Sequence, residues 1–395
     1  MKKSKIKSVV FLSNYLTHHQ QPFSDALFSK LGEGYSFVET DRMPDSQKKL
    51  GYSDANKPSY VKYYTDSGSQ ELVEQADVVI WGSAPIKLIY NRKRACKLTF
   101  RYSERIYKAK LQIYKLPRYF YSFHKIPKSH KNSYLLCASA YASADYAKAL
   151  TFVNKAFKWG YFPETKRYDD LDEMIASKNM KKILWCGRFL DWKHPDAMIS
   201  LAERLKSEGY DFQIDLIGTG DMEDQLQTMI VEKDLSNEVR MLGSMPPEQV
   251  RFHMEKAAIY LFTSDRHEGW GAVLNESMNS ACAVVASHAI GAVPYLLEHE
   301  KNGLIYKDGD LGDLYQKVKY LLDNPDRRVE LSKNAYATIV NEWNAENAAE
   351  KFLALAEELL DSPKAVFPFE NGICSKAELL NDNWFVRRKK KCSKG

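Results

Sequence analysis

Residues 259–286, IYLFTSDRHEGWGAVLNESMNSACAVVA, contain the pattern that decides the fold. An apolar run at 259–262 is followed by a turn with two glycines, a segment with apolar residues at helical spacing, and a second apolar run at 283–286. This order is typical of a strand, a tight turn, a helix and a second, parallel strand. A glycine turn that opens a helix at the carboxyl edge of such a sheet is suited to binding anions. The stretch therefore predicts a doubly wound α/β sheet with a ligand site at its edge.

The same alternation of apolar runs and helical stretches extends along most of the 395-residue chain. It predicts two similar α/β units in series, each with a parallel, doubly wound sheet. We predict helices at 22–31, 198–205 and 345–360. The other predicted strands are 9–12, 35–38, 78–81, 98–101 and 134–138 in the first unit, and 182–187, 212–217, 239–242 and 304–306 in the second.

Composition shifts along the chain indicate where these units begin and end. A polar stretch at 161–173 interrupts the apolar pattern and is typical of an interdomain linker. The predicted parts are a first Rossmann-like unit at 1–165, a linker at 166–180, a second Rossmann-like unit at 181–345, a helix that returns toward the first unit at 346–375, and a basic tail at 376–395.

The overall composition excludes several classes of protein. Hydrophobic residues make up 44% and charged residues 27% of the chain, which is ordinary for a globular protein and excludes a disordered or fibrous one. The six cysteines form no C-x-x-C pair, so a reducing compartment is expected rather than a disulfide framework or a zinc site. The apolar run at 9–12 is too short for a signal peptide, and no run approaches the ~18 apolar residues of a membrane span. We therefore expect a cytoplasmic protein that meets a membrane, if at all, at its surface.

One stretch, residues 91–131, differs from the rest because lysines and arginines alternate with tyrosines and phenylalanines and acids are nearly absent. This composition is typical of a segment that lies at an anionic membrane surface. Two alternatives stay open: an amphipathic helix with a buried aromatic face, and a site for single-stranded nucleic acid. The net charge of +6 suits anionic substrates but is too small to indicate a nucleic-acid partner. A second basic cluster at 387–391 is more typical of a disordered end.

Candidate site residues gather in the opening stretch. Backbone N–H groups of Gly269 to Gly271 are placed to face a phosphate, because they precede a helix. Glu276, in the second turn of that helix, is placed to accept hydrogen bonds from a ribose diol, and Glu268 from a sugar. The alternative is that Glu268 only interacts with the helix dipole and Glu276 is a solvated helical residue.

A second group of candidates follows the predicted strand at 182–187. Arg188 and Lys193 lie in a loop that ends at Pro195 and Asp196, which suit the first turn of a helix. Two cations five positions apart in such a loop can hold a diphosphate. A solvated loop is the alternative for either residue alone.

In combination, the motifs of residues 181–360 resemble the retaining GT-B glycosyltransferases of the family-4 type, the glycosyltransferase group 1 domain. The resemblance implies a GT-B fold, in which two Rossmann-like units face each other across a cleft, the first binding the acceptor and the second the nucleotide sugar. The motifs occur in the family's order: Gly187, Arg188 and Lys193; Gly218 and Gly220; Met241-Leu-Gly243; Glu268 to Glu276 as E-G-x-G-x4-E; Gly291 with Val293-Pro294; and Asn302-Gly303-Leu304.

The resemblance also implies a role for each motif residue. Arg188 and Lys193 would hold the nucleotide diphosphate, Glu268 the hydroxyls of the donor sugar, and Glu276 the ribose. The implied catalytic residues are Glu268, Arg188 and Lys193, and the implied substrate-binding residues of this unit are Glu276, Gly269, Trp270, Gly271, Gly187, Gly218 and Leu242. Ala292 departs from the pattern, because relatives often have a second glycine after Gly291.

In the first unit, four residues follow predicted strands and are candidates for acceptor contact or proton relay. His18 and His19 come after the first strand, and Ser103 and Glu104 after the strand at 98–101. A surface role is the alternative for each of them.

The implied reaction transfers a sugar from a nucleotide diphosphate to an acceptor hydroxyl with retention at the anomeric carbon. The family is described as using a front-face mechanism without a protein nucleophile. We expect no cofactor and no catalytic metal, because the D-x-D pairs at 170–172 and 308–310 follow no apolar strand, and Gly218-Thr-Gly220 lacks the third glycine of an NAD site. The expected partners are a nucleotide sugar and a glycan or lipid-linked acceptor of bacterial surface polysaccharide synthesis, but not nucleic acid. Alternatives are an epimerase, a phosphorylase, or a non-catalytic nucleotide-sugar-binding protein.

Overall fold

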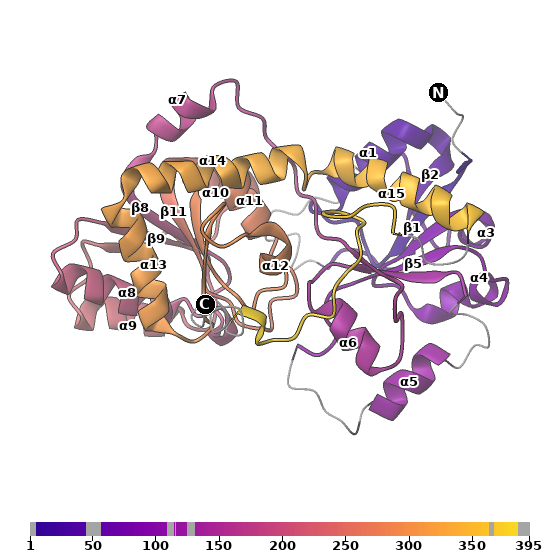
Figure 1. Ribbon diagram of the computed structural model, residues 1–395, viewed down its shortest axis with the longest axis horizontal. Helices are drawn as coiled ribbons and strands as arrows, with labels where there is room; N and C mark the ends of the chain where they lie inside the picture. Colours follow the sequence, from indigo (N-terminus) through magenta and orange to yellow (C-terminus); the bar gives the residue numbers. More distant parts are fainter. Residues whose placement is uncertain are drawn as a thin grey trace. The chain divides into compact units, whose positions relative to one another are not determined.

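The computed structural model describes residues 5–44, 57–108, 114, 116–124, 131–362 and 367–385, and the chain divides into two compact units (Figure 1). Unit 1 consists of residues 1–164 and 343–381, and unit 2 of residues 165–342 and 382–395. The predicted basic cluster at 387–391 lies outside the described residues.

Unit 1 contains a seven-stranded sheet in the order β3-β2-β1-β4-β5-β6-β7. Every pairing in it is parallel. The strands β1, β2, β4 and β6 are buried at every position, which explains why they appear in the sequence as continuous apolar runs. The strands are β1 Val9–Ser13, β2 Tyr35–Glu39, β3 Val61–Tyr63, β4 Val78–Trp81, β5 Thr99–Ser103, β6 Ser133–Cys137 and β7 Ala156–Lys158.

The helices of unit 1 come from both ends of the chain. Helix α15 packs against α1 through aromatic side chains, with the ring of Phe352 centred 6.1 Å from that of Phe23 and 5.9 Å from that of Trp159. Burial of these rings holds the C-terminal helix on the first unit. The helices are α1 Gln21–Leu31, α3 Ser69–Gln75, α4 Tyr90–Arg94, α5 Leu116–His124, α6 Ala142–Lys148 and α15 Ala345–Asp361, with short 3-10 turns η1 Gly32–Gly34 and η2 Ile86–Ile89.

Unit 2 contains a six-stranded parallel sheet in the order β10-β9-β8-β11-β12-β13. The strand order reverses between β8 and β11, and ligands of doubly wound sheets bind at the carboxyl ends of the strands at such a point. The loops that follow β8 and β11 contain Lys193 and Glu268. The strands are β8 Asn179–Cys186, β9 Gln213–Ile217, β10 Val239–Met241, β11 Ala257–Phe262, β12 Ala283–Ser287 and β13 Leu304–Tyr306.

Helices cover both faces of this second sheet (Figure 1). Helix α8 presents Met198, Leu201, Ala202 and Leu205 to the core, as the helical spacing of these residues predicts. The helices are α7 Leu171–Ala176, α8 Asp196–Ser207, α9 Glu223–Glu232, α10 Pro247–Lys256, α11 Val273–Asn279, α12 Val293–Leu296, α13 Leu311–Asp323 and α14 Pro325–Asn341, with a 3-10 turn η4 Asp191–Lys193.

The predicted strands and helices all occur, with bounds that differ by up to three residues. The sequence did not predict β3 and β7, which are three residues long and lie at the two edges of the unit 1 sheet. Runs this short show no periodicity. Within the described ranges, none of the helices is both long and apolar enough to cross a bilayer.

Candidate active site

The loops after β8 and β11 bring two of the predicted catalytic residues into direct contact. Lys193 Nζ lies 2.6 Å from Glu268 Oε2, and each side chain is only 13% exposed. The hydroxyl of Ser264 donates to the same carboxylate oxygen at 3.0 Å. This partly buried pair places a positive and a negative group side by side at the switch point of the sheet.

Two buried side chains, Thr263 and Trp185, fix the position of the Lys193 loop. Thr263 Oγ1 donates to the main-chain oxygen of Lys193 at 2.6 Å and accepts a hydrogen bond from Trp185 Nε1 at 2.8 Å. The main-chain N–H of Asp265 donates to Trp192 O at 3.0 Å. Sequence reasoning missed Thr263 and Ser264, although polar residues that directly follow an apolar strand are a signal for positions at the sheet edge.

The glycines of the β9 loop allow the β8 and β9 loops to pack backbone against backbone. Gly218 has φ 138°, and a Cβ there would lie 1.9 Å from Gly187 O. No side chain fits at this distance, so the first position of the G-x-G motif requires glycine. The predicted residues Gly187, Gly218 and Leu242 lie on successive loops after β8, β9 and β10, joined by the hydrogen bonds from Gly187 N to Ile217 O (3.0 Å) and from Gly218 N to Gly243 O (2.9 Å).

The turn from Glu268 to Gly271 depends on a glycine at its end. Gly271 has φ 91°, and a Cβ there would lie 2.4 Å from the ring of Phe262. The indole of Trp270 is fully buried and donates through Nε1 to Asn275 Oδ1 at 2.9 Å. The side chain of Trp270 therefore packs in the core, and only its main chain is suited to contact a donor.

Ala292, where the family often has glycine, fits the structure without strain. Its φ is −80°, a value that any residue adopts, and its side chain is fully buried. Its N–H donates to Trp270 O at 3.2 Å, and the N–H of Gly291 donates to Glu268 O at 3.4 Å. The alanine thus keeps this loop attached to the Glu268 turn.

Arg188 has a different environment from Lys193. Its side chain is exposed, and among the described residues its guanidinium has no ion-pair or hydrogen-bond partner. The structure therefore brings Lys193 to Glu268 but leaves Arg188 out of this pair. The guanidinium is available for an anion that reaches the loop after β8.

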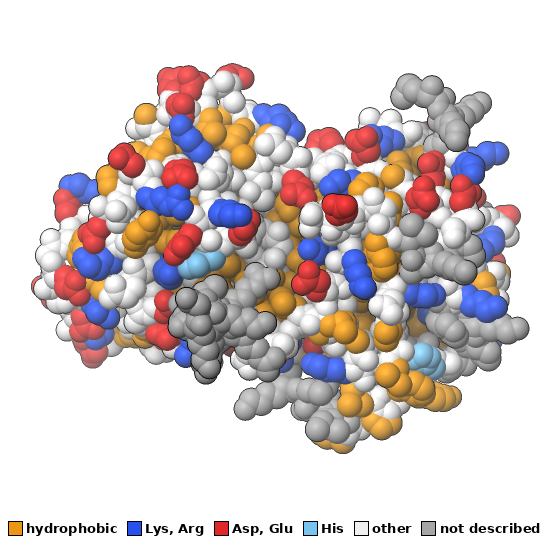
Figure 2. Space-filling view, in the orientation of Figure 1, with side chains coloured by type: hydrophobic (Ala, Val, Ile, Leu, Met, Phe, Trp, Pro, Cys, Tyr) orange, Lys and Arg blue, Asp and Glu red, His pale blue; other side chains and the backbone are white. Residues whose placement is uncertain are grey.

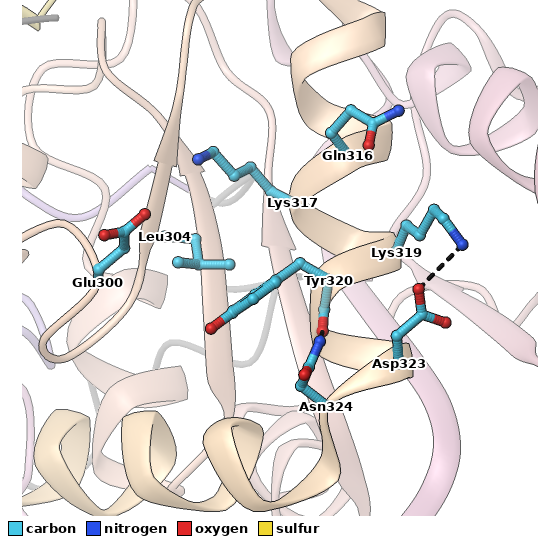
Figure 3. Close-up of a pocket in the computed structure, with 8 residues that line it drawn as sticks. All are labelled: Glu300, Leu304, Gln316, Lys317, Lys319, Tyr320, Asp323 and Asn324. Atoms are coloured by element: carbon cyan, nitrogen blue, oxygen red, sulfur yellow. Dashed lines mark hydrogen bonds and ion pairs between the residues drawn. The ribbon is translucent and has the colours of Figure 1, made fainter. Parts of the chain in front are cut away.

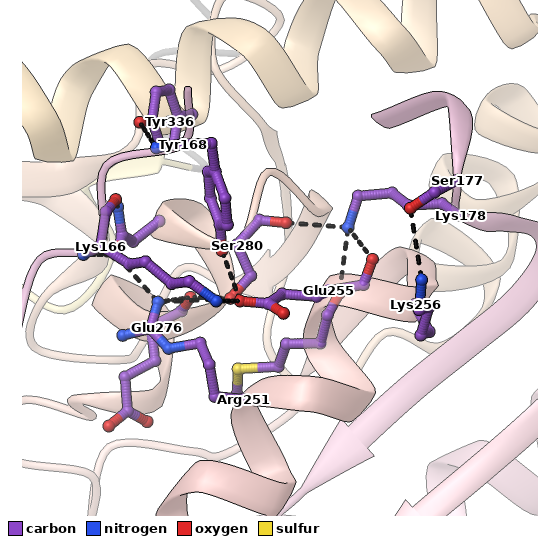
Figure 4. A network of polar contacts seen from close by, with 12 residues as sticks. Lys166, Tyr168, Ser177, Lys178, Arg251, Glu255, Lys256, Glu276, Ser280 and Tyr336 are labelled. Carbon is purple, nitrogen blue, oxygen red and sulfur yellow. Dashed lines mark hydrogen bonds and ion pairs between the residues drawn. The ribbon is translucent and has the colours of Figure 1, made fainter. Parts of the chain in front are cut away.

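Glu276 lies in α11, and Figure 4 shows its carboxylate pointing away from the polar network that surrounds its main chain. The carbonyl oxygen of Glu276 accepts from Ser280 Oγ at 2.8 Å and from Arg251 Nη1 at 3.4 Å. Burial raises the pKa of the Glu276 carboxyl to about 7. Near neutral pH this group both donates and accepts hydrogen bonds, which suits a pair of ribose hydroxyls.

Two of the predicted residues of unit 1, His19 and Glu104, contact Tyr161, which sequence reasoning missed. Tyr161 OH donates to Glu104 Oε1 at 2.9 Å, and the ring of His19 stacks on Tyr161 with 6.1 Å between centroids. Burial lowers the pKa of His18 to about 4 and that of His19 well below its ordinary value. Ser103 Oγ accepts from Tyr146 OH at 3.0 Å. Neutral imidazoles beside a carboxylate and a phenol are suited to holding sugar hydroxyls.

The two D-x-D pairs have structural partners. Asp170 and Asp310 are the N-cap residues of α7 and α13, accepting hydrogen bonds from the main-chain N–H groups of Glu173 and Asp313. Asp172 forms an ion pair with Lys333 at 2.5 Å.

Unit 2 also contains a cavity of about 300 Å³ (Figure 3). The Lys319–Asp323 ion pair, 2.9 Å long, crosses its rim on α13. It is lined by Glu300, Leu304, Gln316, Lys317, Lys319, Tyr320, Asp323 and Asn324. None of the predicted site residues lines this cavity, so it does not serve as the candidate active site.

Comparison with known proteins identifies the class of unit 2. Residues 169–338 match the family described as "Glycosyl transferases group 1". The chain is 30% identical over 183 residues to the amylovoran biosynthesis glycosyltransferase AmsK of Erwinia amylovora, covering 45% of each chain. It is 25% identical over 169 residues to a poly(ribitol-phosphate) alpha-N-acetylglucosaminyltransferase of Staphylococcus aureus, covering 43% of this chain and 34% of that protein. The matched region thus spans less than half the length of either curated relative.

Among solved structures, the chain is similar to HepE of Anabaena in complex with UDP. The TM-score is 0.65 at 14% identity, covering 90% of this chain and 100% of that one. Together with the two parallel doubly wound sheets, this likeness confirms the predicted GT-B fold. Residues 169–338 form a glycosyl transferases group 1 domain, as the motifs predicted.

Proposed function

We propose that the protein is a retaining glycosyltransferase that moves a sugar from a nucleoside diphosphate sugar to an acceptor hydroxyl. The observation that carries the proposal is the Lys193–Glu268 contact at the switch point of a group 1 domain, with the guanidinium of Arg188 available on the same loop. Cations beside a carboxylate suit a substrate that has a diphosphate on one side and sugar hydroxyls on the other.

In this proposal each side chain has one task. Lys193 and Arg188 stabilise the charge that develops on the diphosphate as it leaves an oxocarbenium-like sugar. Glu268, held by Ser264, accepts hydrogen bonds from hydroxyls of that sugar. Glu276 binds the ribose, and no metal or cofactor takes part. The acceptor binds in unit 1 near His19, Glu104 and Tyr161.

The printed descriptions of the relatives support particular classes of donor and acceptor. HepE is described in complex with UDP, which makes UDP sugars the first donors to examine. One curated relative acts in amylovoran biosynthesis and another on poly(ribitol phosphate), as their names state. We therefore propose a glycan or lipid-linked acceptor in bacterial cell-surface polysaccharide or glycolipid synthesis.

A screen of nucleoside diphosphates and their sugars tests this proposal. We expect one nucleoside diphosphate, UDP first, to raise the melting temperature by about 5 °C or more at a hundred-fold excess over its Kd. With the matching sugar and an acceptor, nuclear magnetic resonance should show a glycoside with the anomeric configuration of the donor.

Other outcomes identify the alternatives. Conversion of the sugar without an acceptor would indicate an epimerase. Absence of binding by every nucleoside diphosphate would contradict the proposal and favour a scaffold role.

We further propose that unit 1 binds the anionic inner face of the cytoplasmic membrane. Residues 105–131 contain eight Lys and Arg and no Asp or Glu. On α5 and just before it, Tyr121 is 70%, Tyr114 75% and Phe120 44% exposed, so these rings are not part of a buried aromatic face. Figure 2 shows hydrophobic side chains gathered over α5.

The loop after α6 adds to this surface. Leu150 is 66% exposed with φ 51°, an unfavourable conformation for a leucine, and Val153 is 50% exposed. Thr151 Oγ1 lies 3.3 Å from His124 Nε2, which joins the loop to the end of α5. Exposed aromatic and aliphatic side chains among basic residues are suited to the headgroup region of an anionic bilayer.

Vesicle flotation tests this surface. We expect the protein to float with vesicles that contain phosphatidylglycerol but not with pure phosphatidylcholine. The double variant Leu150→Asp/Val153→Asp should lose most of this binding, whereas Val231→Asp, at an equally exposed apolar position of α9 (62%), should keep it. Equal binding by both variants would contradict the proposal.

A further inference from the structure

Two of the buried cations in this protein are fully satisfied by main-chain oxygens. The guanidinium of Arg92, at the start of α4 and 1% exposed, donates to the carbonyls of Val73, Ala76, Asp77 and Leu98 and to Thr99 Oγ1. Lys178, 7% exposed, donates to four carbonyls in unit 2 (Figure 4). These contacts replace the hydrogen bonds to water that each charge loses on burial.

Lys93, the residue next to Arg92 in α4, is a third buried cation without such partners. It is 5% exposed, and within the described parts of the chain its ammonium makes neither a hydrogen bond nor an ion pair. Its ammonium lies over the ring of Trp81, with Nζ 5.6 Å from the centroid. The stem of Lys93 is buried, but its ammonium nitrogen is not a fully buried atom, so an anion from solvent can reach it.

A second cation, Arg101, also lies over the ring of Trp81. Arg101, opposite Trp81 in the register of β4 and β5, places its guanidinium carbon 4.2 Å from the ring centroid. Its Nη1 donates to Gly82 O and its Nε to Tyr146 OH. Arg101 is only partly buried, so solvent reaches the guanidinium.

Within the described ranges, no acid compensates these two charges. Among the described residues neither Lys93 nor Arg101 forms an ion pair with a carboxylate. Burial, and secondarily the charge of Arg101, lowers the pKa of Lys93 to about 8. The indole is held in place by the hydrogen bond from Trp81 Nε1 to Ala84 O at 2.7 Å. Two cations thus lie over one fixed aromatic ring, and among the described residues neither has a carboxylate partner.

We propose that Lys93, Arg101 and Trp81 form an anion site in unit 1 that binds a phosphate group. A guanidinium binds two phosphate oxygens side by side, an ammonium adds a point charge, and together they match the charge of a phosphate monoester. The phosphate supplies hydrogen-bond acceptors that the described residues do not offer to the Lys93 ammonium. This site is built from β4, β5 and α4 of unit 1 and shares no residue with the donor loops of unit 2, so it goes beyond the proposed function.

The first measurement is thermal stability in buffer without phosphate or sulfate. Lys93→Met should melt at or above the temperature of the wild type, because it keeps the buried stem and removes the repulsion between the Lys93 and Arg101 charges. A lysine that only stabilises the fold through Trp81 would give the opposite result, a lower melting temperature or no folded protein. Either of those results would overturn the proposal.

The second measurement adds ligand to the full-length protein. We expect inorganic phosphate or octyl phosphate to raise the wild-type melting temperature by about 5 °C at a hundred-fold excess over Kd, and to leave Lys93→Met unchanged. Lys97→Met, a variant with the same charge change whose ammonium donates to Glu74 O and Gln75 Oε1, should keep the shift.

The outcomes separate the ligand sources. A shift with both compounds means that the site recognises phosphate alone, and a shift with octyl phosphate only means that it takes the phosphate of an amphiphile. A shift that survives in Lys93→Met but disappears in Arg188→Ala places phosphate in the donor loops and overturns the proposal, without affecting the proposed function.

Discussion

Replacement of Glu268 by glutamine is expected to lower donor turnover about 100-fold or more while the protein stays folded. The carboxylate contacts Lys193 at 2.6 Å and Ser264 at 3.0 Å in a position that is only 13% exposed. Glutamine has nearly the same shape but no charge, so it keeps the packing, loses the negative charge and replaces one carboxylate oxygen with an NH2 donor. In a partly buried site this interaction is worth ~3 kcal/mol in the transition state.

The measurement is steady-state kinetics with the donor found in the nucleotide-sugar screen. A loss in kcat rather than in KM for the donor would show that Glu268 acts in the transition state. Glu298→Gln is the matched control, because Glu298 also pairs with a lysine, Lys301, but both side chains are more than 60% exposed. Glu268→Gln with wild-type turnover would remove Glu268 from the catalytic residues.

Replacement of Lys178 by methionine is expected to destabilise unit 2 by about 3 kcal/mol or more. The ammonium donates to four carbonyl oxygens, those of Met254, Glu255, Ala257 and Ser280, at 2.8–3.1 Å. Methionine fills a similar volume but donates no hydrogen bond, so all four oxygens lose this donor, although Met254 O still accepts from the N–H of Ala257 and from Cys282 Sγ. Each unsatisfied buried group costs about 1–3 kcal/mol, which exceeds the gain from removing a buried charge.

Calorimetry or denaturant unfolding measures this effect, which corresponds to a fall of roughly 6–12 °C in the melting temperature of a unit of this size. Lys181→Met is the control. Lys181 lies on β8, which begins one residue after Lys178, but its side chain is 60% exposed and pairs with the exposed Asp211, so a change within about 0.5 kcal/mol is expected. Equal melting temperatures for the two variants would show that the four hydrogen bonds make no net contribution to the free energy of unfolding.

The predictions for Lys178 and Lys93 distinguish two kinds of buried cation. Lys178 and Lys93 are similarly buried, yet one has four acceptors and the other has none among the described residues. Their methionine variants should therefore change stability in opposite directions. Burial alone does not set the sign, because the balance depends on whether hydrogen bonds replace those lost to water.

The amino-acid sequence by itself determined the fold class and most of the secondary structure. Continuous apolar runs such as Val9–Ser13 predict buried parallel strands, and the glycines at 218 and 271 predict loops in which no side chain fits. These features are local: each depends on residues within a few positions of one another, so they are legible without coordinates. The E-G-x-G-x4-E stretch and the Arg188 loop were recognisable for the same reason.

Only the tertiary structure decided which of these residues meet. Lys193 and Glu268 are separated by 75 positions and are joined because β8 and β11 lie next to each other where the strand order reverses. The tertiary structure likewise placed Tyr161 between His19 and Glu104, buried the indole of Trp270, and brought Lys93 and Arg101 to the ring of Trp81. Strand order, burial and hydrogen-bond partners arise from contacts between distant segments, and local residue patterns do not specify such contacts.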